Sequence, residues 1–170
     1  MVPPPSAAKG TAVERGVAVV PDEPKMRVLF LCTGNSCRSQ MAEGWARHLK
    51  GKSIEPYSAG VEPHGMNNLA IQVMNEAGVN ISCQHSKHVD ELRDVRLDYV
   101  ITVCDDAHEA CPLFSGKTKV VHMGFDDPPR LAKTARSEAE ALSHYRRVRD
   151  EIRAFIESLP GGIEKAGHRA

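Results

Sequence analysis

The stretch that decides the fold is VLFLCTGNSCRS, at residues 28–39. Its apolar run ends at Cys32, and five small or polar residues separate this cysteine from Arg38. Gly34 and Asn35 both tolerate a positive φ, so the chain can turn sharply and its N–H groups can converge on one point. The stretch therefore predicts a buried strand, a tight loop and the start of a helix.

The predicted helix is supported by apolar residues at spacings of three and four, namely Met41, Ala42, Trp45, Ala46 and Leu49. Its N-terminus lies at the loop, where free N–H groups and the positive end of the helix dipole favour a bound anion. Arg38 can add a fork of donors that matches a tetrahedral oxyanion. We therefore expect an oxyanion-binding loop that consists of Thr33, Gly34, Asn35, Ser36, Cys37 and Arg38.

The thiol of Cys32 lies on the floor of this loop and is the expected nucleophile. The positive field of the loop stabilises a thiolate, so we predict that the pKa of Cys32 is lowered, with Ser39 placed to donate a hydrogen bond to the sulfur. A buried structural cysteine in a strand-to-helix turn is the alternative, but such a cysteine would not require Arg38. Cys37 is expected to be a small loop residue or a site of damaging oxidation.

Strand-like and helical patterns alternate along the rest of the chain. We expect strands at residues 27–31, 54–58, 98–103 and 119–122, and helices at residues 39–50, 68–77 and, as a short element, 89–93. A long last helix presents an apolar face from Leu142 to Leu159 and is expected to stop at Pro160. The alternation predicts a single α/β domain of three layers, in which a four-stranded parallel sheet is flanked by helices.

The 170 residues are enough for one domain with its own core, and 22 basic residues balance 22 acidic ones. The balanced charge indicates neither nucleic acid nor a membrane surface as a partner, and the apolar runs are too short to cross a bilayer. We expect residues 1–25 to be a disordered or loosely attached extension, 26–162 to be the domain and 163–170 to be a flexible tail. Five cysteines at reactive spacings indicate a reducing, cytoplasmic setting.

Cys32, Cys104 and Asp127 each follow a predicted strand, so a parallel sheet would bring them to the same edge. Cys104 and Cys111 bracket a short predicted helix. Seven residues of helix rise about 10.5 Å, whereas a disulfide tolerates Cα separations only to roughly 7 Å. A bond between these two cysteines would therefore require residues 104–112 to unwind or loop out, toward solvent. Extra thiols at this edge could accept the two oxidising equivalents of an oxyanion reduction. A phosphatase needs only one cysteine and would have no use for them.

Five segments, taken in order, form a specific combination: VLFLCTGNSCRSQMAEGW at 28–45, YSAG at 57–60, VCDDAHEACP at 103–112, GFDDP at 124–128 and RVRDEI at 147–152. Together they resemble the low-molecular-weight tyrosine phosphatase superfamily and, within it, the thioredoxin-coupled arsenate reductases. The resemblance extends over about residues 26–159.

The resemblance implies a mechanism and a role for each matching residue. Arsenate would bind in the loop, Cys32 would attack arsenic, and Asp127 would protonate the departing oxygen; Asp126 is the competing choice, and the resemblance favours Asp127. Cys104 would then attack Cys32 as arsenite leaves, and Cys111 would close a disulfide with Cys104 that thioredoxin, or another dithiol protein, reopens. The resemblance also implies a role in arsenic detoxification, a monomer, no bound cofactor and a weak phosphatase side activity.

Members of the resembling branch can hold a potassium ion near the loop. Asn35, Glu43 and Ser58 match positions that contribute there, but Lys87 stands where some relatives place an aspartate. Since an ammonium group would repel potassium, we expect no metal at this site. A further cluster on an expected surface loop is not expected to bind metal either: Cys83, His85 and His88.

Two other functions compete with arsenate reduction. A low-molecular-weight tyrosine phosphatase shares the nucleophile, the loop and the acid, but it usually has an aromatic residue where this chain has Pro129, and Cys104 and Cys111 would be unused. A non-enzymatic thiol redox or arsenite sensor could bind arsenite directly through three thiols, but such a sensor would need neither Arg38 nor Asp127.

Overall fold

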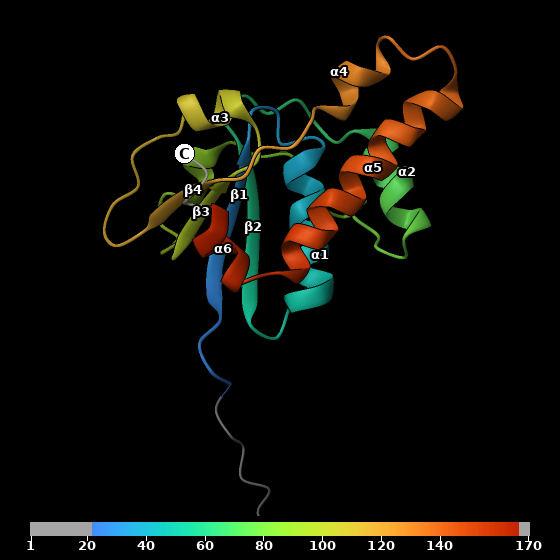
Figure 1. The fold of residues 1–170 in the computed structure, drawn as a ribbon. Coiled ribbons are helices and arrows are strands. Elements are labelled where there is room, and N and C mark those ends of the chain that lie inside the picture. Colours follow the sequence, from blue (N-terminus) through green and yellow to red (C-terminus); the bar gives the residue numbers. More distant parts are fainter. Residues whose placement is uncertain (1–21, 167–170) are drawn as a thin grey trace, which may run out of the picture.

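The structure is a computed structural model that describes residues 22–166 of the chain (Figure 1). Residues 22–25 are exposed and precede the first strand without forming a helix or strand. The rest of the expected N-terminal extension, at residues 1–21, and the end of the expected tail, at residues 167–170, lie outside the described residues.

The core of the fold is a parallel sheet of four strands, β1 (Met26–Cys32), β2 (Ile54–Gly60), β3 (Tyr99–Thr102) and β4 (Lys119–His122), in the order β2-β1-β3-β4. β1 lies between β2 and β3, and its residues 28–31 are fully buried, which explains their continuous apolar character. All carboxyl ends point the same way, toward the end of the molecule where α3 and α4 lie in Figure 1. The expected four-stranded parallel sheet is confirmed.

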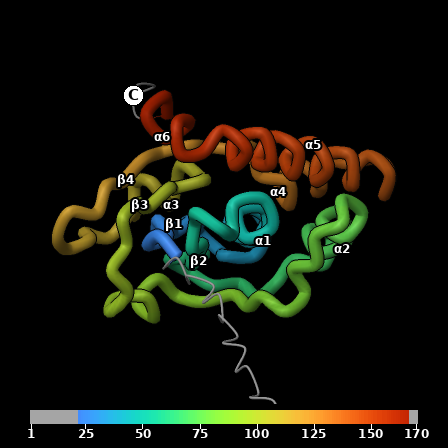
Figure 2. The backbone as a smooth tube through the Cα atoms, turned by 90° about the horizontal axis from the view of Figure 1, so that it is seen from below, coloured from blue at the N-terminus to red at the C-terminus, as the bar shows by residue number. Residues whose placement is uncertain are grey.

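The helices are α1 (Arg38–Lys50), α2 (Asn68–Glu76), a 3₁₀ turn η1 (Val89–Leu92), α3 (Asp105–Glu109), α4 (Pro128–Ala132), α5 (Glu138–Glu157) and α6 (Gly161–Ala166). α1 packs on β1 and β2, and α5 runs across α1 (Figure 2). Among the described residues, no helix combines the length and the apolar character that a membrane span needs. The helices and the sheet form one domain, as expected.

α5 forms because its sequence carries a start signal and a continuous apolar face. The Ser137 hydroxyl caps the helix by accepting a hydrogen bond from the Glu140 N–H. Its buried residues follow helical spacing along one side of the helix, which packs on α1, α2 and α4: Leu142, Tyr145, Val148, Ile152, Phe155 and Ile156. This packing fixes α1, and with it the loop at the N-terminus of α1.

Two short helices differ from the expectation. The expected stop at Pro160 holds only for α5, because the chain turns and continues as α6, in which Ile163 is 4 % exposed and Ala166 is 8 % exposed. The domain boundary expected at residue 162 is therefore too early, and residues 163–166 are not a flexible tail. α4 was not expected; Pro128 stands in its first turn, where no N–H is needed.

Candidate active site

The loop at residues 32–38 lies at the carboxyl end of the sheet, between β1 and α1. Cys32 is the last residue of β1, and Arg38 is the first residue of α1. Asn35 has a φ of 44° and is the one non-glycine residue in the described part of the chain with a positive φ. The strand, the turn and the helix start are where the sequence predicted them.

The carbonyl groups of the loop are held by the chain around it. They accept hydrogen bonds in the pairs Cys32–Val61, Thr33–Glu62, Gly34–His64 and Ser36–Asn67 from backbone N–H groups, and in the pair Asn35–Gln40 from a side-chain amide. Within the described residues, the N–H groups of Gly34, Ser36 and Cys37 have no backbone acceptor. The loop carbonyls are thus hydrogen-bonded to the surrounding chain, whereas these N–H groups have no backbone acceptor. Such a set of N–H groups forms a nest that favours binding of an anion.

Gly60, at the end of β2, is what lets this loop approach the sheet. A Cβ atom at this position would lie 2.5 Å from the carbonyl oxygen of Thr33 and 2.9 Å from the amide nitrogen of Asn35. Both distances are too short for a real carbon atom, so a larger residue would displace the loop. No signal in the sequence singles out this glycine beyond its place in the YSAG segment.

The sulfur of Cys32 is surrounded by polar groups that fix one hydrogen-bond direction. Its Sγ lies 2.8 Å from Ser39 Oγ and accepts from the Asn35 N–H at 3.2 Å. Asn35 Nδ2 also donates to Ser39 Oγ, at 2.9 Å, while Asn35 Oδ1 accepts from the Lys87 N–H, at 2.8 Å. Because Ser39 Oγ accepts from Asn35, its own hydrogen is directed to the sulfur, as the sequence predicted.

The pKa of Cys32 is raised, not lowered, because the thiol is only 3 % exposed and burial disfavours the charged form. The hydrogen bonds from Ser39 and Asn35 act in the opposite direction, and the Cys104 thiol beside it raises the pKa further. The predicted lowering is therefore wrong in this structure. Burial at the end of a central strand outweighs the donors of the loop, and burial could not be measured from the sequence.

Ser39→Ala is expected to slow alkylation of Cys32 by iodoacetamide at neutral pH by about tenfold, because the variant loses a hydrogen bond to the thiolate. Since Ser39 lowers the pKa of Cys32 against burial, the alkylation rate of the variant should rise at a higher pH than that of the unchanged chain. Mass spectrometry of the Cys32 peptide measures the rate. Ser53→Ala, in the turn before β2, is the control. Equal pH profiles for the Ser39→Ala variant and the unchanged chain would contradict the role of Ser39.

Arg38 and Asp127 face each other at the mouth of the loop. Arg38 Nη1 donates to the carbonyl oxygen of Phe125 at 3.0 Å, and Nη2 lies 3.5 Å from Asp127 Oδ1. Asp127 precedes α4 but does not cap it, so its carboxyl is left for the site. Asp126 instead pairs with Arg147 at 2.9 Å. The structure thus places Asp127, rather than Asp126, beside the anion loop.

Cys104 lies next to the loop because β3 pairs with β1. Leu31 is paired with Thr102, which sets Cys104 beside Thr33, and Thr33 Oγ1 lies 3.4 Å from Cys104 Sγ. Cys104 is 3 % exposed, and it immediately precedes α3. The structure therefore brings Cys32 and Cys104 together at one edge of the sheet.

Cys111 lies at the other end of α3 and is half-buried. Its thiol donates a weak hydrogen bond to the carbonyl oxygen of Pro112 at 3.7 Å, and burial raises its pKa. All five cysteines are free thiols. α3, at residues 105–109, lies between Cys104 and Cys111, and each helical residue adds a rise of about 1.5 Å between them.

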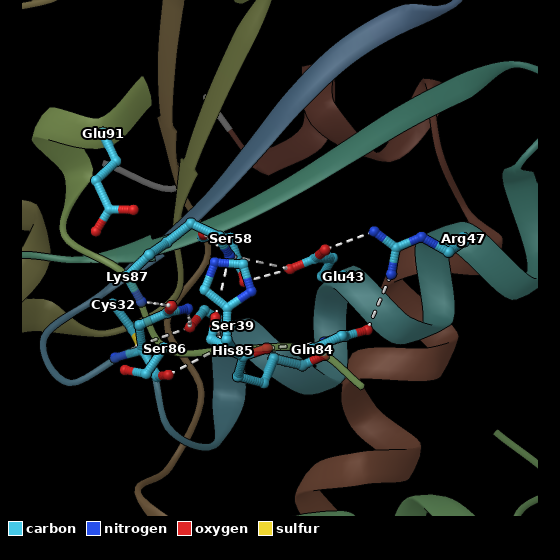
Figure 3. A network of polar contacts seen from close by, with 12 residues as sticks. Cys32, Ser39, Glu43, Arg47, Ser58, Gln84, His85, Ser86, Lys87 and Glu91 are labelled. Carbon is cyan, nitrogen blue, oxygen red and sulfur yellow. Dashed lines mark hydrogen bonds and ion pairs between the residues drawn. The ribbon is translucent and has the colours of Figure 1, made fainter. Parts of the chain in front are cut away.

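Lys87 occupies the region that was considered for potassium (Figure 3). Its Nζ donates to the carbonyl oxygens of Ser58 at 3.0 Å and His85 at 3.2 Å, and it lies 4.0 Å from Glu43 Oε2. The Ser58 hydroxyl donates to the same carboxylate oxygen of Glu43. The ammonium group thus takes oxygen ligands that a potassium ion would use, while Asn35 is engaged by Ser39 and Lys87.

We expect activity to be the same in potassium and in sodium at equal ionic strength. Lys87→Asp, which removes the ammonium group and adds a carboxylate, is expected to make activity rise with potassium. The steady-state rate in each salt measures the effect, and Lys52→Asp, on the exposed turn before β2, is the control. Potassium stimulation of the unchanged chain would refute the expectation.

Two further cysteines were candidates, namely Cys37 within the anion loop and Cys83 outside it. Cys37 is 3 % exposed, and burial raises its pKa far above the usual range, which agrees with a small loop residue. Cys83 is exposed, and no group of three metal-ligating side chains occurs within residues 22–166. Sequence analysis missed the support from residues 84–87, where Ser86 Oγ donates to the Gly34 carbonyl at 3.1 Å. No local motif marks such a long-range contact.

A buried thiol at the end of a central parallel strand, beneath a nest of N–H groups closed by an arginine, is an arrangement that suits attack of sulfur on a tetrahedral oxyanion. The profile of the family described as low molecular weight phosphotyrosine protein phosphatase matches residues 27–168. The chain belongs to this family.

Relatives within the family carry a more specific name. The chain is 48 % identical over 137 residues to an arsenate reductase of Shouchella clausii, covering 79 % of this chain and 95 % of that one. It is 48 % identical over 125 residues to an arsenate reductase of Bacillus subtilis, covering 74 % and 88 %.

The solved structures that match this chain include both arsenate reductases and a tyrosine phosphatase. An arsenate reductase in the phosphate binding state matches with a TM-score of 0.62 and 29 % identity over 81 % of this chain and 98 % of that chain. A thioredoxin-dependent arsenate reductase of Corynebacterium glutamicum matches with a TM-score of 0.59 and 30 % identity, over 84 % and 63 %. A low molecular weight protein tyrosine phosphatase from T. tengcongensis matches with a TM-score of 0.60 and 28 % identity, over 83 % and 99 %.

Proposed function

We propose that this protein reduces arsenate to arsenite. The observation that carries the proposal is the position of Cys104, whose thiol lies against Thr33 of the anion loop, with Cys111 at the far end of the following helix. Hydrolysis of a phosphate ester needs the loop, Cys32 and a general acid, but no second thiol. A buried second thiol beside the nucleophile supports a reaction in which sulfur is oxidised.

The first half of the reaction takes place in the anion loop. Arsenate is held by the loop N–H groups and by the Arg38 guanidinium, which already points at this space through its contact with Asp127. The Cys32 thiolate attacks arsenic and forms a sulfur–arsenic bond. Asp127 protonates the oxygen that leaves as water. Arsenic is still in its +5 state at this point.

The second half transfers two electrons to arsenic through sulfur. The Cys104 thiolate attacks Cys32 Sγ, so a disulfide forms while the electron pair of the sulfur–arsenic bond passes to arsenic, which leaves as arsenite. Cys111 then attacks Cys104 and releases Cys32 as a thiolate. The net oxidation is stored in a Cys104–Cys111 disulfide, away from the loop. No bound cofactor is required, because the electrons come from the two thiols.

The Cys104–Cys111 disulfide must be reduced before the next turnover, and we propose that thioredoxin reduces it. The likeness to the thioredoxin-dependent reductase of C. glutamicum supports this choice. The exchange needs a dithiol donor that meets Cys111, which is half-buried and sits near the exposed end of α3. A reducing compartment such as the cytoplasm would supply it.

One coupled assay tests the proposal. NADPH oxidation is followed with the purified protein, thioredoxin, thioredoxin reductase and arsenate, and each component is omitted in turn. The expected result is oxidation that requires all four and stops when phosphate replaces arsenate. Oxidation that continues without arsenate, or none with either thioredoxin or a glutaredoxin as the donor, would refute the proposal. Replacing thioredoxin by a glutaredoxin with glutathione identifies the donor.

A weak phosphatase activity is the second candidate, since the loop, Arg38 and Asp127 equally suit phosphate. The structural likeness to the T. tengcongensis phosphatase supports it. Hydrolysis of p-nitrophenyl phosphate in the absence of any thiol donor measures this activity. We expect it to be present and slow, because Pro129 rather than an aromatic residue follows Asp127-Pro128.

A further inference from the structure

A chain of polar contacts ties α3 to the sheet, outside the anion loop. Thr102 on β3 lies with its Oγ1 2.8 Å from His122 Nδ1 on β4, and His122 Nε2 lies 3.0 Å from Asp105 Oδ1 on α3. His108, also on α3, has its Nδ1 3.4 Å from Thr102 Oγ1 and its ring 4.4 Å from that of His122. We call these four residues the clasp.

The hydrogen positions in the clasp follow from its acceptors. The Asp105 carboxylate can only accept, so His122 Nε2 carries the hydrogen. In the neutral ring His122 Nδ1 then accepts from the Thr102 hydroxyl, which leaves Thr102 Oγ1 free to accept from His108 Nδ1. Each contact of the clasp thus joins a donor to an acceptor, and the chain of contacts begins and ends on α3.

The clasp matters because α3 has little else to hold it. The helix has five residues, too few for a stable helix in isolation, and Ala107 is its only buried side chain. Cys104, the residue before it, provides no side-chain cap. Asp105 in the first turn and His108 in the last turn, three positions apart, both face His122. Two ends of one short helix therefore depend on a single imidazole of β4.

We propose that His122 is a positioning residue of the thiol cascade, which holds α3 in the helical form and so keeps Cys104 and Cys111 apart until the disulfide forms. The inference rests on the proposed function, because that function requires Cys104 and Cys111 to join. Asp105 and His108 lie inside the segment that must unwind, so their contacts with His122 are lost in the disulfide form. The clasp therefore stabilises the dithiol relative to the disulfide.

A redox titration without arsenate tests the inference. The full chain is equilibrated with mixtures of reduced and oxidised dithiothreitol, where two electrons and two protons pass from the Cys104 and Cys111 thiols to the oxidised dithiothreitol. Peptide mapping after alkylation measures the Cys104–Cys111 fraction. His122→Phe, which keeps a ring against His108 but loses both nitrogen contacts, is expected to favour the disulfide about fivefold.

Two further variants show whether the residues act together. Asp105→Asn is expected to favour the disulfide by only about twofold, because this carboxylate is 88 % exposed. Asp105→Asn combined with His122→Phe should match His122→Phe alone, since the two changes break the same contact. The control is His144→Phe on α5, which should leave the midpoint unchanged.

Urea unfolding of both redox forms separates a positioning role from a general loss of stability. His122→Phe is expected to lower the unfolding midpoint of the dithiol form more than that of the disulfide form, because the Thr102–His122 contact within the sheet is lost in both forms but the contacts with α3 exist only in the dithiol form. Equal losses in both forms, or a redox midpoint like that of the unchanged chain, would overturn the inference and leave the proposed function intact. If the unchanged chain forms no Cys104–Cys111 disulfide at any ratio, both proposals fail.

Discussion

Cys104→Ser is expected to reduce arsenate turnover by about 10³-fold or more while hydrolysis of p-nitrophenyl phosphate stays close to that of the unchanged chain. Serine keeps the contact with Thr33 Oγ1 and fits the buried position, so the anion loop should be undisturbed. It cannot attack the sulfur of Cys32, so arsenic would stay in its +5 state and no arsenite would form. The thioredoxin-coupled assay and the phosphatase assay, run on one preparation, measure the two activities.

Two companion variants define the limits of this result. Cys32→Ser should lose both activities, because both need the nucleophile. Cys111→Ser should complete one turnover at most and accumulate a Cys32–Cys104 disulfide, which peptide mapping detects. A Cys104→Ser variant that loses phosphatase activity together with arsenate turnover would contradict the separate roles of the two cysteines.

Asp127→Asn is expected to slow hydrolysis of phenyl phosphate by about 10² to 10⁴-fold, the usual contribution of a general acid. The loss should be smaller with p-nitrophenyl phosphate, whose leaving group departs readily without a proton. Asparagine has nearly the same shape and keeps a polar contact with Arg38, so binding of inorganic phosphate as an inhibitor should change much less than the rate. Steady-state kinetics with both esters measures the difference.

Asp126→Asn is the matched control for this prediction. Its carboxylate is 62 % exposed and pairs with Arg147, which is itself 43 % exposed, so the ion pair contributes little to the stability of the fold. The variant is expected to retain its activity. If Asp126→Asn loses more activity than Asp127→Asn, then Asp126 is the general acid and the assignment to Asp127 is wrong.

Much of the fold could be predicted because its signals are local. The apolar run before Cys32, the tolerance of Asn35 for positive φ and the apolar face of α5 each lie within a few turns of chain. β4 has the predicted bounds, Lys119–His122. β3 is one residue shorter than expected at each end, although the N–H groups of Asp98 and Val103 still donate to β1.

What could not be predicted depends on distant parts of the chain. The raised pKa of Cys32 comes from burial, which the packing of the whole domain decides. The pairing of Asp126 with Arg147, which leaves Asp127 for the site, joins residues 21 positions apart. α6 begins with two glycines, a weak helix signal, and is stabilised by the burial of Ile163.

The two inner sulfurs lie at the ends of neighbouring strands, whereas the third lies beyond a helix of five residues. In the proposed cycle, rigid scaffold therefore surrounds the chemistry, and only the outermost thiol has to travel. Once the disulfide joins Cys104 and Cys111, the anion loop is empty and Cys32 is again a thiolate. A new oxyanion could then bind before the electron donor has reduced the Cys104–Cys111 disulfide. Oxyanion binding and disulfide reduction can therefore occur in either order.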